Sequence, residues 1–206
     1  MAQQPRILVV GTHNRKKCRE MQDVLNGLPL EVRPLADFDP VPEAEETGAT
    51  FEANAAAKAL AYARATGHWC VADDSGLEVP ALGDRPGVYS ARWGGEQGND
   101  RLNNQRLVEE LKGVPPDRRQ ARYVCAAVLA SPDGRVLLTA HGTCEGVVVE
   151  RPAGAGGFGY DPHFHLPDRG CTMAQLRPQE KHAISHRGAA LRALRGKIEH
   201  LLQGNA

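Results

Sequence analysis

The sequence has no excess of charge, because 25 Lys and Arg residues balance 25 Asp and Glu residues. A protein that binds nucleic acid without sequence preference needs a strong basic field, so this class is disfavoured. No run approaches the roughly 20 apolar residues of a membrane-spanning helix. The first residues also lack the apolar stretch of a secretory signal peptide. We therefore expect a cytoplasmic protein with neither a nucleic-acid nor a membrane partner.

The five cysteines form no C-x-x-C pair and are odd in number. Most lie in apolar runs, so we expect buried free thiols in a reducing compartment. The Walker A pattern G-x-x-x-x-G-K-[ST] is absent, which excludes a P-loop. We find no internal repeat and no low-complexity segment.

The composition is that of an ordinary globular protein, with 41% hydrophobic and 24% charged residues. A chain of 206 residues suits one domain, taken here as 1–206, with a sizeable core. Strands and helices alternate in the first half, and a hairpin centred on residues 132–134 follows in the second. This order predicts an α/β protein with a mixed sheet. The expected strands are 6–11, 30–35, 69–72, 77–79, 121–131 and 135–150, the last as one strand or two; the expected helices are 18–28, 50–66, 100–112 and one from about 185.

The stretch at 71–93 contains two adjacent carboxylates, Asp73 and Asp74, at the end of an apolar run. Paired acids on a rigid strand end, followed by a turn, are the arrangement that a hard cation needs. The alternative is that Asp-Asp-Ser-Gly is simply a turn, because these residues dominate turns for backbone reasons.

Basic residues follow the first expected strand. Thr12 and Asn14 can cap the next helix, and its free N–H groups with Lys16 and Lys17 would form an anion site. The alternative is an ordinary helix cap with solvated lysines. Further along, Lys58 shares one face of the second helix with the residue four positions earlier.

The segment at 151–161 has five glycines with Phe158 and Tyr160 between them. Such a loop lets the backbone approach a ligand while an aromatic side chain offers a flat face. A flexible connector with its aromatics in the core is the alternative. Lys181, His186 and Arg187 lie near the start of the last helix, where cations oppose the helix dipole, so they suit a ligand that carries acceptors.

Taken together and in this order, these features resemble the inosine triphosphate pyrophosphatase family. The resemblance covers essentially the whole chain and rests on THNRKK (12–17), EETG (45–48) with Asn54 and Lys58, ADDSGL (72–77), PGVYSAR (86–92), GGFGYDP (156–162), Lys181 and SHRG (185–188). His13 departs from the family pattern, in which bacterial members usually have Gly, and we expect only a local loop adjustment there.

The resemblance implies an elongated mixed-sheet α/β fold with two lobes around a central nucleotide-binding cleft, acting as a homodimer. The reaction would be Mg²⁺-dependent hydrolysis of ITP, dITP and XTP to the monophosphate and pyrophosphate, which cleanses the nucleotide pool. By the same resemblance, Glu46 and Asp74 hold Mg²⁺ and Asp74 is the general base, although Asp73 is near enough to share either role. The implied substrate-binding residues are Thr12, His13, Asn14, Arg15, Lys16, Lys17, Lys58, Ser75, Phe158, Gly159, Tyr160, Asp161, Lys181, His186 and Arg187.

Base selection would come from Phe158 stacking on the purine, with charged side chains at its polar edge. Hypoxanthine and xanthine carry an acceptor oxygen at C6 that Lys or Arg donors match. Adenine carries an amino group there, which would leave buried donors unpaired. Guanine shares the oxygen, so its rejection must depend on its 2-amino group.

Two other functions fit part of the pattern. A Maf-like pyrimidine triphosphate pyrophosphatase shares the strand–turn–helix opening and the acidic residues, but the motifs at 158–161 and 185–188 argue against it. A non-catalytic nucleotide sensor would bind ITP without turnover, and the retained Glu46, Asp73 and Asp74 argue against that.

Overall fold

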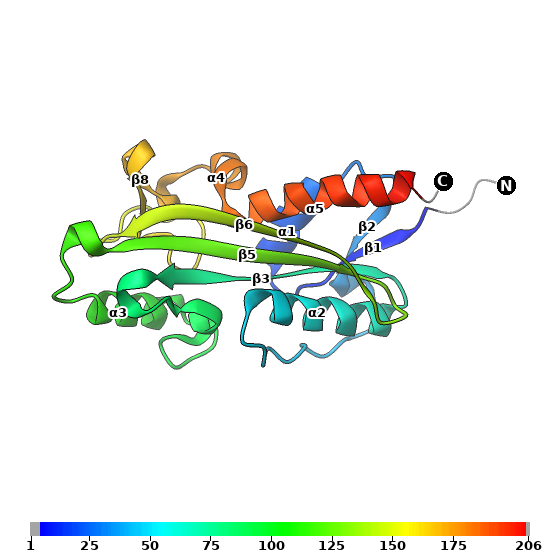
Figure 1. Ribbon diagram of the computed structural model, residues 1–206, viewed down its shortest axis with the longest axis horizontal. Coiled ribbons are helices and arrows are strands. Elements are labelled where there is room, and N and C mark those ends of the chain that lie inside the picture. The colour runs from blue at the N-terminus through cyan, green and yellow to red at the C-terminus, as the bar shows by residue number, and fades with distance from the viewer. Residues whose placement is uncertain (1–4, 205–206) are drawn as a thin grey trace. The chain divides into compact units, whose positions relative to one another are not determined.

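The computed structural model describes residues 5–204 and is a mixed α/β structure (Figure 1). The helices are α1 (Arg15–Leu25), α2 (Phe51–Thr66), α3 (Asp100–Glu110), α4 (Pro178–Ile184) and α5 (His186–Gln203). The strands are β1 (Ile7–Val10), β2 (Glu31–Pro34), β3 (Trp69–Val79), β4 (Arg85–Pro86), β5 (Gln120–Ala130), β6 (Val136–Val148), β7 (Phe164–Leu166) and β8 (Cys171–Thr172).

These strands form one mixed sheet in the order β2-β1-β3-β5-β6-β7-β8, with β4 paired to β3. β1 is parallel to both β2 and β3, with Val9 opposite Arg33 and Cys70. β7 is antiparallel to β6 and to β8. The strand–helix half of the chain thus gives parallel neighbours and the hairpin half gives antiparallel ones, as the expected α/β class requires.

The described chain divides into two compact units, each made of several segments. The first unit comprises residues 5–74, 125–142 and 187–204, and the second comprises 75–124 and 143–186. The divisions fall inside β3, β5 and β6. The prediction of a single domain over 1–206 stays a prediction.

The first unit has its core between the strands and the helices α1 and α5. Apolar positions of both helices pack against β1, β5 and β6, and the fully buried members include Met21, Leu25, Leu191, Leu194 and Ile198. Figure 1 shows α5 on one side of these strands and α2 on the other. α2 begins where Thr50 caps the amide of Ala53 and ends at the left-handed Gly67, as its sequence predicts.

The second unit has a separate apolar core. Leu107 and Leu111 at the end of α3 contact residues from β3, β5 and β7, among them Leu77, Tyr123 and Phe164. The spacing of the leucines predicted this helix correctly.

Several predicted elements need correction. β3 is continuous from Trp69 to Val79, so the placing of Asp73 and Asp74 at a strand end before a turn was wrong. The first helix stops at Leu25 rather than near residue 28. Residues 136–148 form one strand, and α4 with the short strands β4, β7 and β8 was not predicted.

The five cysteines are free thiols. Two of them, Cys70 and Cys125, are buried, and the other three are half-buried, so the expectation of mainly buried thiols holds only in part. None of the helices in residues 5–204 combines the length and the apolar content that a membrane span requires.

Candidate active site

Because β3 is continuous, the side chains of Asp73 and Asp74 lie on opposite faces of the sheet. Successive side chains of a strand point to opposite faces of the sheet. Asp74 accordingly contacts Asn54 and Lys58 of α2, while Asp73 contacts Lys17 of α1 and Arg187 of α5. Each carboxylate therefore belongs to its own cluster, and the two do not occupy equivalent positions.

The Asp74 cluster joins two carboxylates through one ammonium group. Lys58 Nζ lies 2.5 Å from Oε1 of Glu46 and 3.1 Å from Oδ1 of Asp74. The second oxygen of Asp74 accepts a hydrogen bond of 3.1 Å from the Asn54 side-chain amide. Asn54, Lys58 and Asp74 are all buried. Glu46, which comes from a loop, and Asp74, which comes from a strand, thus converge on a single cation.

The pKa of Asp74 lies above its ordinary value, mainly because the side chain is buried. The nearby Glu46 raises this pKa further, while Lys58, Lys17 and Asn54 lower it in part. For Lys58, burial lowers the pKa but the surrounding carboxylates outweigh it, so its pKa is raised and the side chain is a cation. A carboxylate with a raised pKa is a better proton acceptor than an ordinary Asp.

The donor set around Lys58 fits Mg²⁺. Two carboxylates already place oxygens within hydrogen-bond distance of one cation, and Mg²⁺ in nucleotide-processing enzymes is usually held by one or two carboxylates, substrate phosphates and water. Across residues 5–204 there is no group of three or more His, Cys, Asp or Glu side chains that could hold a metal by themselves. A metal at this position would therefore take its further ligands from substrate and solvent.

The Asp73 cluster is a buried ion network. Oδ2 of Asp73 lies 3.0 Å from Nε of Arg187 and 3.5 Å from Nζ of Lys17. The same guanidinium donates to Glu20 at 2.7 Å. Asp73 and Arg187 are each only 2% exposed. Burial alone would raise the pKa of Asp73, but Lys17 and Arg187 hold it well below its usual range. Asp73 is therefore an anion with little tendency to accept a proton.

The turn between β1 and α1 is a capped helix start. Oδ1 of Asn14 accepts the amides of Lys16 and Lys17, at 2.9 and 3.1 Å, so Asn14 is the helix cap that both interpretations of this turn predicted. The hydroxyl of Thr12 accepts the Asn14 amide at 3.2 Å. His13 lies edge-on to the ring of Tyr62. Lys17 is thus held beside Asp73, while Arg15 and Lys16 are exposed.

In the second unit, Asp161 is the centre of a second polar cluster. Its Oδ2 accepts from Nζ of Lys181 at 2.5 Å and from the amide of Phe158 at 2.9 Å. Its Oδ1 accepts from the hydroxyl of Tyr123 at 3.3 Å. The Lys181 ammonium also lies over the ring of Phe158, 4.5 Å from its centroid. Three residues predicted to read the base are thus brought together.

Tyr123 is a member of this cluster that sequence reasoning missed. Its ring stacks on His186 with centroids 4.6 Å apart and an interplanar angle of 13°. Burial raises the pKa of Tyr123 well above its usual value, and Asp161 adds to the shift, so the hydroxyl is a donor. An aromatic in an apolar strand carries no sequence signal that separates this role from core packing.

Gly159 and Tyr160, both predicted to bind substrate, have structural partners within the second unit, and their substrate-binding role stays a prediction. Gly159 donates its amide to Asp100 at 2.7 Å and accepts from Asn104 at 2.8 Å, so both backbone groups are engaged with α3. Tyr160 is buried and donates to the carbonyl of Ser90. Arg187 belongs to the first unit, where it pairs with Asp73 rather than with a residue of the Asp161 cluster. Its predicted base-reading role stays a prediction. So does the role of Ser75.

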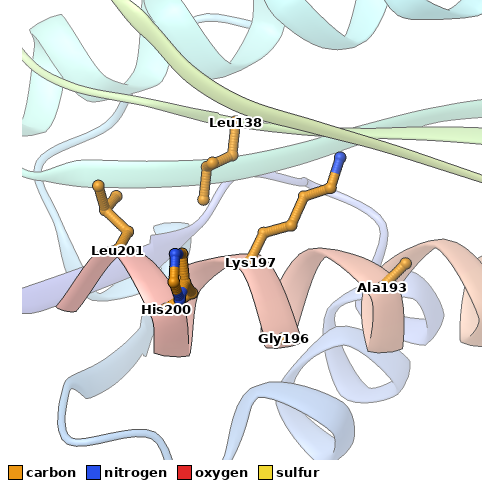
Figure 2. A pocket seen from close by; sticks show the side chains of 6 residues that line it. All are labelled: Leu138, Ala193, Gly196, Lys197, His200 and Leu201. Carbon is orange, nitrogen blue, oxygen red and sulfur yellow. The ribbon is translucent and has the colours of Figure 1, made fainter. Parts of the chain in front are cut away.

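A pocket lies against α5 in the first unit (Figure 2). Figure 2 shows that its lining comes from α5 together with one residue of β6; the residues are Leu138, Ala193, Gly196, Lys197, His200 and Leu201. None of the predicted site residues lines it. The predicted site residues lie instead in the polar clusters around Asp74 and Asp73 in the first unit and around Asp161 in the second.

Solved structures with the same fold cover almost the whole chain. The HAM1 protein from Coxiella burnetii is 40% identical, with a TM-score of 0.87, and the match spans 95% of this chain and 99% of that one. A nucleoside-triphosphatase / dITP/XTP pyrophosphatase from Mycobacterium abscessus is 45% identical, with a TM-score of 0.74, over 92% of this chain and 98% of that one. The mixed α/β fold expected from the sequence is confirmed.

The dITP/XTP pyrophosphatase of Geobacillus kaustophilus is 48% identical over 197 residues, which is 96% of either chain. That of Geobacter sulfurreducens is 48% identical over 191 residues, 93% of this chain and 96% of the other. Such similarity over nearly the full length makes this protein an enzyme of the pyrophosphatase class. The model of the Ham1 family matches residues 8–197, and the chain belongs to that family. The resemblance read from the motifs is thereby confirmed.

Proposed function

We propose that this enzyme hydrolyses the non-canonical purine nucleoside triphosphates dITP, XTP and ITP to the monophosphate and pyrophosphate, with Mg²⁺ as cofactor. The names of the Geobacillus and Geobacter relatives support the substrates. The observation that carries the proposal for the metal is the convergence of Glu46 and Asp74 on the ammonium of Lys58. Removal of such nucleotides would cleanse the nucleotide pool, a role that suits the cytoplasm.

The Asp74 cluster and the first turn of α1 would act on the triphosphate. When bound, Mg²⁺ would neutralise phosphate charge and lower the pKa of a water molecule. Glu46 and Asp74 would hold it, and Lys58 would turn from the carboxylates to the phosphates. Lys17 would add a second positive charge near the leaving pyrophosphate. By the family resemblance, Asp74 would accept the proton of the attacking water. Asp73 is less suited to this role, because Lys17 and Arg187 hold it as an anion.

The Asp161 cluster would act on the base. Phe158 offers a ring face for stacking, and Lys181 offers donors to the C6 oxygen of hypoxanthine or xanthine. Asp161 would hold Lys181 in place, and Tyr123 would hold both Asp161 and the His186 ring. An adenine amino group in place of the oxygen would face the Lys181 donors without an acceptor, which is a large penalty in a buried site.

The position of bond cleavage tests the reaction itself. With dITP as substrate in ¹⁸O-labelled water, attack at the α-phosphorus puts the label in dIMP and leaves pyrophosphate unlabelled. Mass spectrometry of both products reads the outcome. Labelled pyrophosphate would contradict attack at the α-phosphorus, and release of orthophosphate from the intact triphosphate would contradict α–β cleavage.

Replacing Lys181 with Met should lower kcat/KM for dITP about 10- to 100-fold, the effect of losing a charge-assisted hydrogen bond. The reason is that the substitution keeps much of the side chain's bulk over Phe158 but removes the donors to C6. Inhibition by inorganic tripolyphosphate should hardly change, because it has no base. Lys112→Met is the matched control, since that lysine is exposed and pairs only with Glu109 in the described contacts. Equal losses for dITP and ATP would argue against base reading, because adenine has no C6 oxygen for Lys181 to bind.

We also propose that the enzyme is a homodimer, which the family resemblance supports. Light scattering coupled to gel filtration would decide, with a mass of twice 22.2 kDa expected.

A further inference from the structure

Three side chains at four-residue spacing form one face of α2. Asn54, Lys58 and Tyr62 are all buried, and Asn54 and Tyr62 are each only 1% exposed. Each contacts a residue of the acidic segment 44–48. Asn54 Oδ1 accepts the amide of Gly48 at 2.7 Å, Lys58 donates to Glu46 at 2.5 Å, and the Tyr62 hydroxyl accepts the amide of Ala44 at 3.2 Å.

These three contacts share one register. Four helical residues rise about 6 Å, and two residues of extended chain span about 6.6–6.8 Å. A step of four along α2 therefore matches a step of two along the segment. Because residue 44 lies at Tyr62 and residue 48 at Asn54, the segment runs antiparallel to the helix. The side chain of Glu46, midway between the two anchored amides, is thereby directed to Lys58.

Asn54 and Tyr62, the two outer residues of this face of α2, also contact β3 and the turn before α1. The side-chain oxygen of Asn54 accepts from the Gly48 amide, and its side-chain nitrogen donates to Asp74. One side chain therefore links the segment 44–48 to β3. Gly48 permits the close approach, because a Cβ there would lie 2.7 Å from Asn54 Oδ1. At the other end, the ring of Tyr62 contacts His13 in the turn before α1.

We propose that Asn54 and Tyr62 are positioning residues that fix the distance between Glu46 and Asp74, and thereby set the affinity of the enzyme for its divalent metal. This inference rests on the proposed metal-dependent function. Neither side chain touches the substrate in this account. Both act by holding the segment 44–48 along α2, with Lys58 at the centre of the register.

Two substitutions remove the anchors separately. Tyr62→Phe deletes only the acceptor for the Ala44 amide and keeps the ring against His13. Asn54→Ala deletes both hydrogen bonds of the amide and introduces a strong helix former. Thr66→Ala is the matched control, since it removes a hydroxyl that donates to the carbonyl of Tyr62 but contacts none of residues 44–48 in the described bonds.

The inference predicts two results for folded variants, with folding checked by circular dichroism. Hydrogen exchange should accelerate at the Ala44 amide in Tyr62→Phe and at the Gly48 amide in Asn54→Ala, without any metal or nucleotide present. The Mg²⁺ concentration for half-maximal dITP hydrolysis should rise about 10- to 100-fold in both variants, as for other residues that orient metal ligands. KM for dITP at saturating Mg²⁺ should stay close to wild type, and Thr66→Ala should show neither change.

Unchanged exchange at both amides would contradict the anchoring, and faster exchange with an unchanged Mg²⁺ requirement would contradict its role in metal affinity. If Asn54→Ala does not fold, Tyr62→Phe decides alone. A wild-type enzyme inactive on dITP and XTP would instead overturn the proposed function, while the exchange measurement would still test the anchoring.

Discussion

Replacing Asp74 with Asn should lower kcat for pyrophosphate release from dITP by about 10³-fold or more, since a general base contributes about 10²–10⁴-fold and a metal ligand is lost with it. Asn has the same shape, so its oxygen can still accept from the Asn54 amide. The buried ion pair with Lys58 is lost, but Glu46 still neutralises the ammonium. Steady-state kinetics with a pyrophosphate-coupled assay measures the effect.

The control for this variant is Glu52→Gln. Glu52 is an acid at the start of α2 whose side chain is half exposed and pairs with His141. Neutralising it removes the same charge from the same region without touching Glu46, Lys58 or Asp74. We expect wild-type kinetics. Near-normal turnover in a folded Asp74→Asn enzyme would remove Asp74 from the catalytic role.

Replacing Arg187 with Met should lower the free energy of unfolding by about 3–5 kcal/mol, the usual cost of leaving a buried charge without its partner. Asp73 would keep Lys17, at 3.5 Å, and the weak thiol donor of Cys125, at 3.8 Å, in a position with almost no solvent. For a chain of this size, about 1 kcal/mol shifts Tm by roughly 2–4 °C, so a fall of about 6–20 °C is expected. Thermal unfolding followed by circular dichroism measures it.

A double variant separates the lost pair from lost packing. Asp73→Asn combined with Arg187→Met removes both charges, and part of the lost Tm should return because no uncompensated anion is buried. The wild type should also lose stability as pH falls below the ordinary aspartate range. Asp73 has a lowered pKa when folded, so its contribution is present above its unfolded pKa and is lost on protonation. A single Arg187→Met variant as stable as wild type would contradict the network.

The elements that sequence reasoning placed well are those with local signals. Thr50 and Gly67 bracket α2 as a cap and a left-handed stop, and both conformations depend mainly on neighbouring residues. The Asp-Asp-Ser-Gly segment shows the opposite case. Its composition is typical of a turn, but Asp73 and Asp74 lie within a continuous strand whose two faces each supply cationic partners. Tertiary ion pairing overrode local propensity there.

The site shows the same division between local and distant information. The motifs contain most residues of the Asp74 and Asp161 clusters, and the four-residue spacing placed Asn54 and Lys58 on one face correctly. No spacing rule could pair Asp73 with Arg187, which lies 114 residues away. Nor could it show that Tyr62 and Tyr123 fix polar groups, because buried tyrosines in apolar segments look like core residues.

The most direct test of the account is pyrophosphate release from dITP, ITP, XTP, GTP and ATP, each with Mg²⁺ and with excess EDTA. We expect rapid release from the first three with Mg²⁺, little from GTP and ATP, and none from any nucleotide with EDTA. Equal rates for all five purines, or release that persists in EDTA, would contradict it.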